Sequence, residues 1–308
     1  MKAKSNKKVR ALLLFSGGLD SLLAAKVLKE QGIEVTALTF VSYFFNAQQA
    51  KKSAKENGLN LILKDFSKKH FQIVKNPHFG YGAGINPCLD CHLLMLKEAK
   101  KIAEKEKFDI LATGEVLGQR PLSQNTRALR IIEQEAGLVG KILRPLSAKV
   151  LPETEMEKKG LVNREKLLGF QGRSRKSQLA LAQKYGLKNY PTPAGGCILT
   201  DKEYAKKLRE LLKNVKKPKP SDLELLRIGR HFWAEKTHFI LGRNHEENLK
   251  LKKLAESGDI LMEPKDIPGP TALIRGKKDR KVPEEAKKLL LKYTKKAPKN
   301  IKTELIPI

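Results

Sequence analysis

The stretch that most constrains the fold is FSGGLDS, residues 15–21, close to the amino terminus. It follows an apolar run over residues 9–15, which is typical of a strand buried on both faces, and precedes residues 21–31, whose apolar side chains recur at helical spacing. Glycines in such a loop let the backbone approach a ligand, and the first amides of the helix and the serine hydroxyls supply donors. The stretch predicts a loop that binds a phosphate. A tight turn that happens to be rich in glycine and serine is the alternative.

The string SGGLDS resembles the PP-loop, SGGxDS, of the ATP pyrophosphatases, which cleave ATP between its α and β phosphates and adenylate a substrate. The match is complete over these six residues. The resemblance implies that Ser16, Gly17, Gly18 and Ser21 hold the pyrophosphate end of ATP. It also implies that Asp20 lies near the phosphates and acts through Mg²⁺.

Further strands and helices alternate after this loop. Strands are predicted over 33–41, 61–66 and 108–116, with a helix that ends at Gly58 between the first two. This alternation predicts an α/β fold, a doubly wound parallel sheet with its ligand at the carboxyl ends of the strands. The last of these strands ends in LATGE, which resembles the ATG segment of PP-loop enzymes, so the resemblance adds Gly114 to the ATP site.

Charge is the strongest signal in the composition. The chain has 308 residues, and 62 Lys and Arg against 33 Asp and Glu give a net charge of +29. A surface of thermophile type would raise both signs together, so the excess of one sign indicates a polyanionic partner, RNA or DNA. No apolar run reaches the roughly 18 residues of a membrane span, and we expect a cytoplasmic protein without a membrane partner.

Three cysteines lie in predicted turns. Cys88 and Cys91 belong to NPCLDCH ahead of a predicted helix, and Cys197 ends PAGGC. Three thiolates could ligate a 4Fe-4S cluster with one iron left open. They could also relay a persulfide, with Cys88 or Cys91 carrying the sulfur and Cys197 resolving the disulfide. A zinc site with His92 is a third possibility, which adjacent helical ligands suit poorly.

These motifs together resemble the tRNA-thiolating branch of PP-loop enzymes, the thiouridine and thiocytidine synthetases, in its iron-sulfur form. The resemblance implies a tRNA sulfurtransferase that adenylates a uridine, forming 2-thiouridine or 4-thiouridine, and then replaces the carbonyl oxygen with sulfur. Asp20, Cys88, Cys91 and Cys197 would be catalytic, and the three cysteines would be the cluster ligands. The sulfur donor would be free sulfide or a persulfide carrier. A lysidine-type ligase, or an RNA- or ribosome-binding protein whose nucleotide site is regulatory, are the alternatives.

A second domain is expected at the carboxyl end. Residues 213–220, KNVKKPKP, are charged and carry prolines, which predicts an extended linker. We therefore expect a catalytic domain over 1–205, a linker over 206–220 and a smaller α+β domain over 221–308. In that domain residues 223–228 and 237–241 are predicted to be strands. The strings GRNHEENLKLKKLAESGDI and DIPGPTALIRG resemble the RNA-binding domain of NFACT proteins.

Basic side chains in both domains are the expected RNA contacts. Residues 275–302 alone hold twelve Lys or Arg and three Asp or Glu. Contacts of this kind bind phosphates, and their affinity falls as salt rises. The predicted RNA-binding residues are Arg173, Arg175, Lys176, Arg230, Arg243, Arg275, Lys277 and Lys278. The sequence leaves the oligomeric state unknown.

Overall fold

The chain divides into two compact units, Met1–Ile198 and Leu199–Ile308. The structure, a computed structural model, describes residues 8–187, 190, 197–277, 281–294 and 302–308. Within those ranges, no helix combines the length and the apolar character that crossing a bilayer requires.

The first unit is built on a parallel sheet, in which the described residues supply four strands in the order β3-β2-β1-β4. The strands are β1 (Arg10–Leu14), β2 (Glu34–Val41), β3 (Asn60–Asp65) and β4 (Ile110–Thr113). Leu14 at the end of β1 is in register with Leu38 of β2 and with Thr113 of β4. The loops that follow β1 and β4 are therefore neighbours at the carboxyl edge of the sheet. This arrangement confirms the predicted α/β fold.

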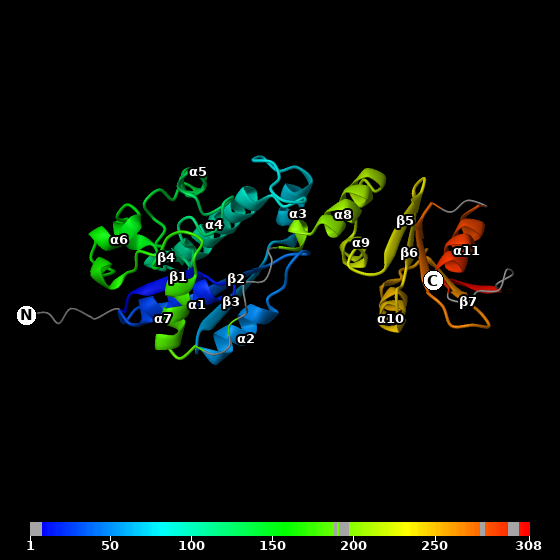
Figure 1. Ribbon diagram of the computed structural model, residues 1–308. Helices are drawn as coiled ribbons and strands as arrows, with labels where there is room; N and C mark the ends of the chain where they lie inside the picture. The colour runs from blue at the N-terminus through cyan, green and yellow to red at the C-terminus, as the bar shows by residue number, and fades with distance from the viewer. Residues whose placement is uncertain (1–7, 188–189, 191–196, 278–280, 295–301) are drawn as a thin grey trace, which may run out of the picture. The chain divides into compact units, whose positions relative to one another are not determined.

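Helices cover both faces of this sheet, because successive residues of a strand point to opposite sides. Leu13 packs in the core shared with α1 (Leu19–Lys29), α2 (Gln48–Glu56) and α7 (Lys176–Lys184). Leu12 packs in the core shared with α4 (Cys88–Lys105) and α5 (Thr126–Ala136). Figure 1 shows these two helical layers on opposite sides of the sheet. The remaining elements of the unit are α3 (Ser67–Lys75), α6 (Glu155–Lys158) and 3-10 turns at Ala148–Val150, Arg164–Lys166 and Ile198–Thr200.

The second unit contains an antiparallel sheet, whose described strands follow the order β5-β6-β8-β7-β9. They are β5 (Arg230–Ala234), β6 (Thr237–Leu241), β7 (Ile260–Pro264), β8 (Ala272–Gly276) and β9 (Thr303–Pro307). The helices are α8 (Lys202–Asn214), α9 (Pro220–Leu225), α10 (His245–Leu254) and α11 (Val282–Tyr293). The expected smaller α+β domain is confirmed.

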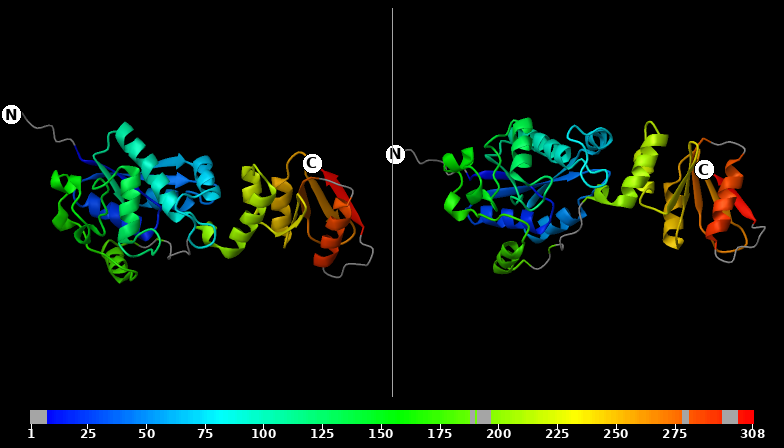
Figure 2. Two further views of the ribbon diagram at one scale, coloured as in Figure 1. Left: turned by 90° about the horizontal axis from the view of Figure 1, so that it is seen from above. Right: turned by 45° about the horizontal axis from the view of Figure 1, so that its top comes forward.

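This second sheet also has helices on both faces, as the views in Figure 2 show. Phe239 of β6 packs with Ala286 and Leu290 of α11. Ile240, the next residue, packs on the other face with Leu225 of α9 and Leu251 of α10. The alternation along β6 therefore places α11 on one side and α9 with α10 on the other.

Two local predictions were wrong. Residues 213–220 were expected to be extended, but residues 213 and 214 end helix α8 (Lys202–Asn214): Asp201 caps the helix, and Leu208 and Leu211 are buried at helical spacing. Residues 223–228 were expected to be a strand, but Leu223 and Leu225 lie in α9, which Pro220 opens at its first turn. The domain boundaries themselves stay predictions.

Candidate active site

The loop of residues 16–21 turns from β1 into α1 at the carboxyl edge of the sheet. Gly17 has a φ of +76°, and a Cβ on it would lie 2.7 Å from Cα of Ala50, so only glycine fits there. The Gly18 amide donates to Ser16 Oγ at 3.3 Å, and Ser21 Oγ donates to the Gly18 carbonyl at 2.8 Å. Because α1 begins at Leu19, its unpaired first amides belong to this loop.

The segment after β4 lies directly against this loop. A Cβ on Gly114 would lie 2.8 Å from both N and Cα of Ser21. No side chain can occupy that space unless one of the two backbones moves. Glycine in the ATG motif is therefore the residue that lets the two segments meet.

Three residues from later segments surround the Asp20 carboxylate. Gln119 Nε2 donates to Asp20 Oδ2 at 2.7 Å, and Arg175 Nη2 lies 3.5 Å from each carboxylate oxygen. Gln178 of α7 is buried and donates to Gln119 Oε1 at 2.8 Å. Asp20 is thus oriented by neighbours and remains partly exposed, with 22% of its side chain open to solvent.

Cys88 lies in the first turn of α4 beside His92, one helical turn further on. Burial alone would raise the pKa of the Cys88 thiol. Hydrogen bonding to His92, the charge of His92, the Ser123 hydroxyl and the charge of Arg120 together outweigh burial and lower that pKa. At a given pH more of Cys88 is therefore in the thiolate form, the nucleophilic form of cysteine, than of an ordinary cysteine.

Glu115 holds His92 in its charged form. His92 Nδ1 lies 3.1 Å from Glu115 Oε1, while Arg144 Nε donates to Glu115 Oε2 at 3.0 Å and Arg144 Nη1 bonds Glu133. Burial alone would lower the pKa of His92, but hydrogen bonds to Cys88 and Glu115 and their charges raise it to about 9. Burial would likewise raise the pKa of Glu115, yet the charges of Arg144 and His92 hold it at about 2. At neutral pH an imidazolium thus faces Cys88.

Cys91 and Cys197 differ from Cys88 in their surroundings. Cys91 is buried in the core between the sheet and α4, and burial raises its pKa, with further increases from the charges of Cys197 and Cys88. Cys88 and Cys197, the other two predicted cysteines, therefore lie close enough for their charges to act on Cys91. Among the described residues, no group of three His, Cys, Asp or Glu side chains is arranged to hold a metal ion.

The basic residues predicted to bind RNA have unequal surroundings. Arg173 and Lys176 are exposed around the start of α7, whereas Arg175 turns toward Asp20. In the second unit Arg230 lies over the Tyr293 ring at 4.7 Å. Arg243 is half exposed and forms an ion pair with Glu247 in the first turn of α10, the helix that follows it.

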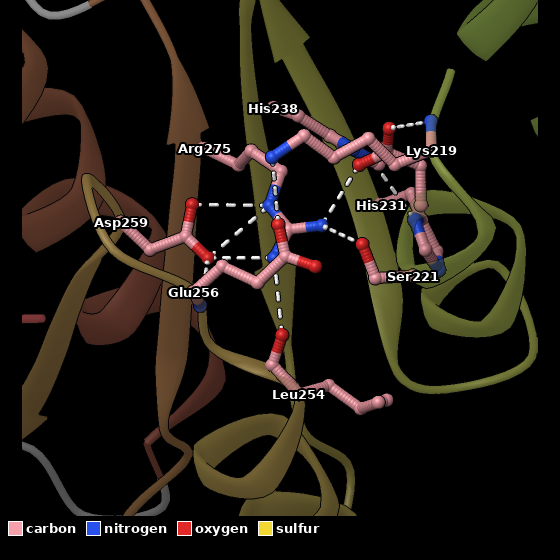
Figure 3. Close-up of polar contacts among 9 residues, drawn as sticks. Lys219, Ser221, His231, His238, Leu254, Glu256, Asp259 and Arg275 are labelled. Atoms are coloured by element: carbon pink, nitrogen blue, oxygen red, sulfur yellow. Dashed lines mark hydrogen bonds and ion pairs between the residues drawn. The ribbon is translucent and has the colours of Figure 1, made fainter.

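Arg275 does not lie as an RNA contact would require. Its guanidinium donates to Asp259, Asp222, Ser221 and the Leu254 carbonyl (Figure 3). These partners occupy the donors that a phosphate would need, so Arg275 has a structural role instead. Lys277 is exposed, and Lys278 lies outside the described residues. RNA binding by the other basic residues stays a prediction.

Sequence reasoning missed several residues of this site. Gln178 and Arg144 reach it only through tertiary contacts and carry no motif of their own, while Gln119 follows the ATG segment and contacts Asp20 only through the fold. Glu115 belongs to the LATGE string, and His92 had been considered only as a zinc ligand. In α4, Cys91 faces the core while His92 faces Glu115, so one tetrahedral ion is not favoured there.

Residues 6–169 match the family model described as Thiamine biosynthesis protein (ThiI). The chain belongs to this family. Residues 229–305 match the model of the NFACT protein RNA binding domain. Both resemblances expected from the motifs are confirmed.

Relatives of the ThiI-family segment include two bacterial proteins named probable tRNA sulfurtransferase. The protein of Finegoldia magna is 32% identical over 145 residues, covering 45% of this chain and 36% of the relative. That of Moorella thermoacetica is 30% identical over 148 residues, with the same coverage of 45% and 36%. The chain therefore spans 36% of the length of these relatives. A solved complex of a 4-thiouridine synthetase with RNA and ATP is 22% identical, with a TM-score of 0.37 over 71% of this chain and 52% of that one.

The contact at Gly114 predicts a strong effect of one methyl group. We expect Gly114→Ala to lower the unfolding free energy by about 1–3 kcal/mol, because its Cβ would overlap the Ser21 backbone. Displacement of the loop should also weaken ATP binding about tenfold or more, measured by titration calorimetry. Gly169→Ala is the matched control, since a Cβ there only touches the Lys149 side chain at 3.3 Å. Equal ATP affinity in both variants would contradict the role given to Gly114.

The Cys88–His92 pair predicts a pH dependence of thiol reactivity. Thiolate forms as pH rises through the pKa, and this pKa is lowered, so alkylation of Cys88 by iodoacetamide should reach half its maximal rate below the pH of an ordinary cysteine. His92→Gln removes the cation and should move the midpoint upward. Rates are followed by mass spectrometry of the Cys88 peptide. Lys97→Gln, an exposed residue of the same helix, should leave the midpoint unchanged. An unmoved midpoint in His92→Gln would remove His92 from the argument.

Proposed function

We propose that the chain is an ATP-dependent tRNA sulfurtransferase that forms 2-thiouridine or 4-thiouridine and releases AMP and pyrophosphate. One observation carries the proposal. The segment of residues 114–119 contacts both halves of the site: Gly114 and Gln119 meet the phosphate loop, and Glu115 bonds His92 beside Cys88. One short segment thus joins the loop suited to ATP with the surroundings of the Cys88 thiol. The names of the relatives point to the same reaction.

In the first step the uridine carbonyl oxygen attacks the α phosphorus of ATP, and the bond to pyrophosphate breaks. The product is an adenylated base, which now carries a leaving group that the carbonyl lacked. The glycine-rich loop and the first amides of α1 would hold the departing pyrophosphate. The target base must leave its stack to reach this site.

Mg²⁺ fits the Asp20 carboxylate. Mg²⁺ is bound in nucleotide sites through one or two carboxylates together with substrate phosphates, and Asp20 presents a partly exposed carboxylate on the phosphate loop. Bound there, the ion would neutralise phosphate charge. Gln119 and Arg175 would then orient Asp20 toward it.

In the second step a sulfur nucleophile attacks the adenylated carbon and AMP departs. If Cys88 carries a persulfide, its terminal sulfur forms the new C–S bond. The Cys197 thiolate then attacks Cys88 Sγ, the S–S bond to the base breaks, and the thiolated base leaves. A disulfide between the two cysteines remains, which an external dithiol must reduce. His92 favours the anionic form of Cys88 throughout.

A 4Fe-4S cluster on Cys88, Cys91 and Cys197 is the other way to supply sulfur. Three thiols are the ligands that such a cluster takes when one iron is left open, and the charges of Cys88 and Cys197 both act on Cys91. Such a cluster supplies an open iron that can hold sulfide. The thiolate character of Cys88 suits either route.

The RNA substrate would be held by exposed cations of both units, among them Arg173, Lys176 and Lys277. tRNA is the partner that the net charge of +29 and the RNA-binding family of residues 229–305 favour. Free thiols at all three cysteines suit a reducing compartment such as the cytoplasm.

The reaction is tested anaerobically with unmodified tRNA transcripts and ATP, in one series with sulfide and in a second with a low-molecular-weight persulfide and a dithiol reductant. We expect release of AMP and pyrophosphate together with thiouridine, measured by mass spectrometry of the nucleosides. Asp20→Asn should lower pyrophosphate release about 100-fold or more. Cys88→Ser should abolish thiouridine while pyrophosphate is still released.

Two outcomes would favour the alternatives. If tRNA stimulates no release of AMP or pyrophosphate, the nucleotide site is regulatory. Pyrophosphate release that needs an amine nucleophile and is indifferent to Cys88→Ser would indicate a lysidine-type ligase.

The two sulfur routes are separated by iron and sulfide analysis of anaerobically purified protein. A cluster predicts about four irons per chain and a broad absorption near ~400 nm, both lost in Cys197→Ala. Iron-free protein that forms thiouridine from the persulfide and dithiol but not from sulfide would establish the persulfide route instead.

A further inference from the structure

One end of the second sheet carries a row of unusual side chains on the face that α9 and α10 cover. Trp233 of β5 is in register with His238 of β6, and His238 is in register with Arg275 of β8. Further along the same face, Ile240 and Leu273 are buried against α9 and α10. The apolar residues of this face are thus covered by helices, while the row lines a hollow.

The Trp233 indole is held flat by a histidine pair. It stacks on the His238 ring with centroids 4.0 Å apart and planes 8° from parallel. His231 Nε2 must donate to the Ile228 carbonyl at 2.8 Å, so in neutral His231 Nδ1 accepts the proton of His238 Nε2 at 2.9 Å. Burial lowers the pKa of His231 to about 3. The indole therefore rests on a neutral, oriented aromatic ring.

Arg275, the neighbour of His238 in the row, is held by carboxylates (Figure 3). Its Nη1 donates to Asp222 Oδ1 at 2.8 Å and its Nη2 to Asp259 Oδ2 at 2.6 Å. Lys219 Nζ bonds Glu256 across the rim at 2.9 Å. Moving a charged group whose hydrogen-bond partners are all in place is costly, so Arg275 is held rigidly in this position.

Above the row lies a hollow of about 280 Å³, which Trp233, His238 and Arg275 line together with Lys217, Lys219 and Lys236. Lys217 and Lys236 are exposed, and neither forms an ion pair with a described residue. We propose that this hollow binds one unpaired nucleotide of RNA, with its base against Trp233 and its phosphates against Lys217 and Lys236. This inference rests on the proposed RNA substrate and names one of its contacts.

The chemistry of the hollow suits a nucleotide better than a bare polyanion. An aromatic ring stacks any base, and neighbouring lysines attract the phosphates on either side of it. A site for phosphate alone would need no tryptophan.

The test uses the fluorescence of the full-length chain, because Trp233 is the sole tryptophan of the sequence. Stacking of a base on the indole should quench this fluorescence. The probe is single-stranded hexaadenylate, compared with inorganic polyphosphate of equal charge. We expect saturable quenching by the oligonucleotide and little by polyphosphate.

Variants then assign the effect to the hollow, with binding followed by the anisotropy of labelled hexaadenylate. Trp233→Leu should weaken binding about 5- to 150-fold, and Trp233→Tyr should restore most of it. Lys236→Ala should weaken binding and make it less dependent on salt. Lys253→Ala removes the same charge from the exposed side of α10 and is the matched control.

The outcomes separate this inference from the proposed reaction. Equal quenching by polyphosphate, or unchanged affinity in folded Trp233→Leu and Trp233→Tyr, would overturn the nucleotide site even if AMP and pyrophosphate are released with tRNA. Quenching by hexaadenylate with loss in Trp233→Leu would support it even if no thiouridine forms.

Discussion

The close approach of Gly114 to the backbone of Ser21 is the contact on which the arrangement of the candidate site in the first unit depends. Because β1 and β4 are parallel neighbours, the segments that follow them leave the sheet side by side. Only the missing side chain of Gly114 lets them touch. From there the chain runs through Glu115 to Gln119, so one short segment orients the thiol network and the Asp20 carboxylate at once.

The charged network behind Cys88 is the second requirement. A buried carboxylate destabilises a fold unless it is paired and hydrogen-bonded, and Glu115 has three partners in Thr113, Arg144 and His92. Loss of the Glu115 carboxylate would remove the anionic partner of His92 and leave Arg144 with Glu133 alone. The network therefore couples the stability of the fold to the protonation of the site. The ion pairs of Glu115 that keep His92 charged also stabilise the buried region around them.

Much of this architecture was predictable from local signals. The phosphate loop, the strands beside it and the helix after Cys88 are each specified by apolar runs and glycines within a dozen residues. In contrast, residues 223–228 alternate like a strand over a length too short to exclude a helix, and Pro220 decides for α9. Gln119, Gln178 and Arg144 enter the site through contacts between segments far apart in sequence, which no local pattern encodes. Arg275 looked like a phosphate ligand because its carboxylate partners are also distant.

The strand order of the second sheet also separates its two edges. Trp233 lies on β5 at one edge, and Thr303–Pro307 form β9 at the other. Four strand spacings lie between them, a distance of roughly 19 Å. Ile308, directly after β9, is hydrogen-bonded to Gly258 and Asp259, which line the same hollow as Trp233. A dye attached there would lie at the edge of the hollow, close enough to accept excitation energy from the indole. Trp233 would be the natural fluorescence donor for measuring distances within the second unit.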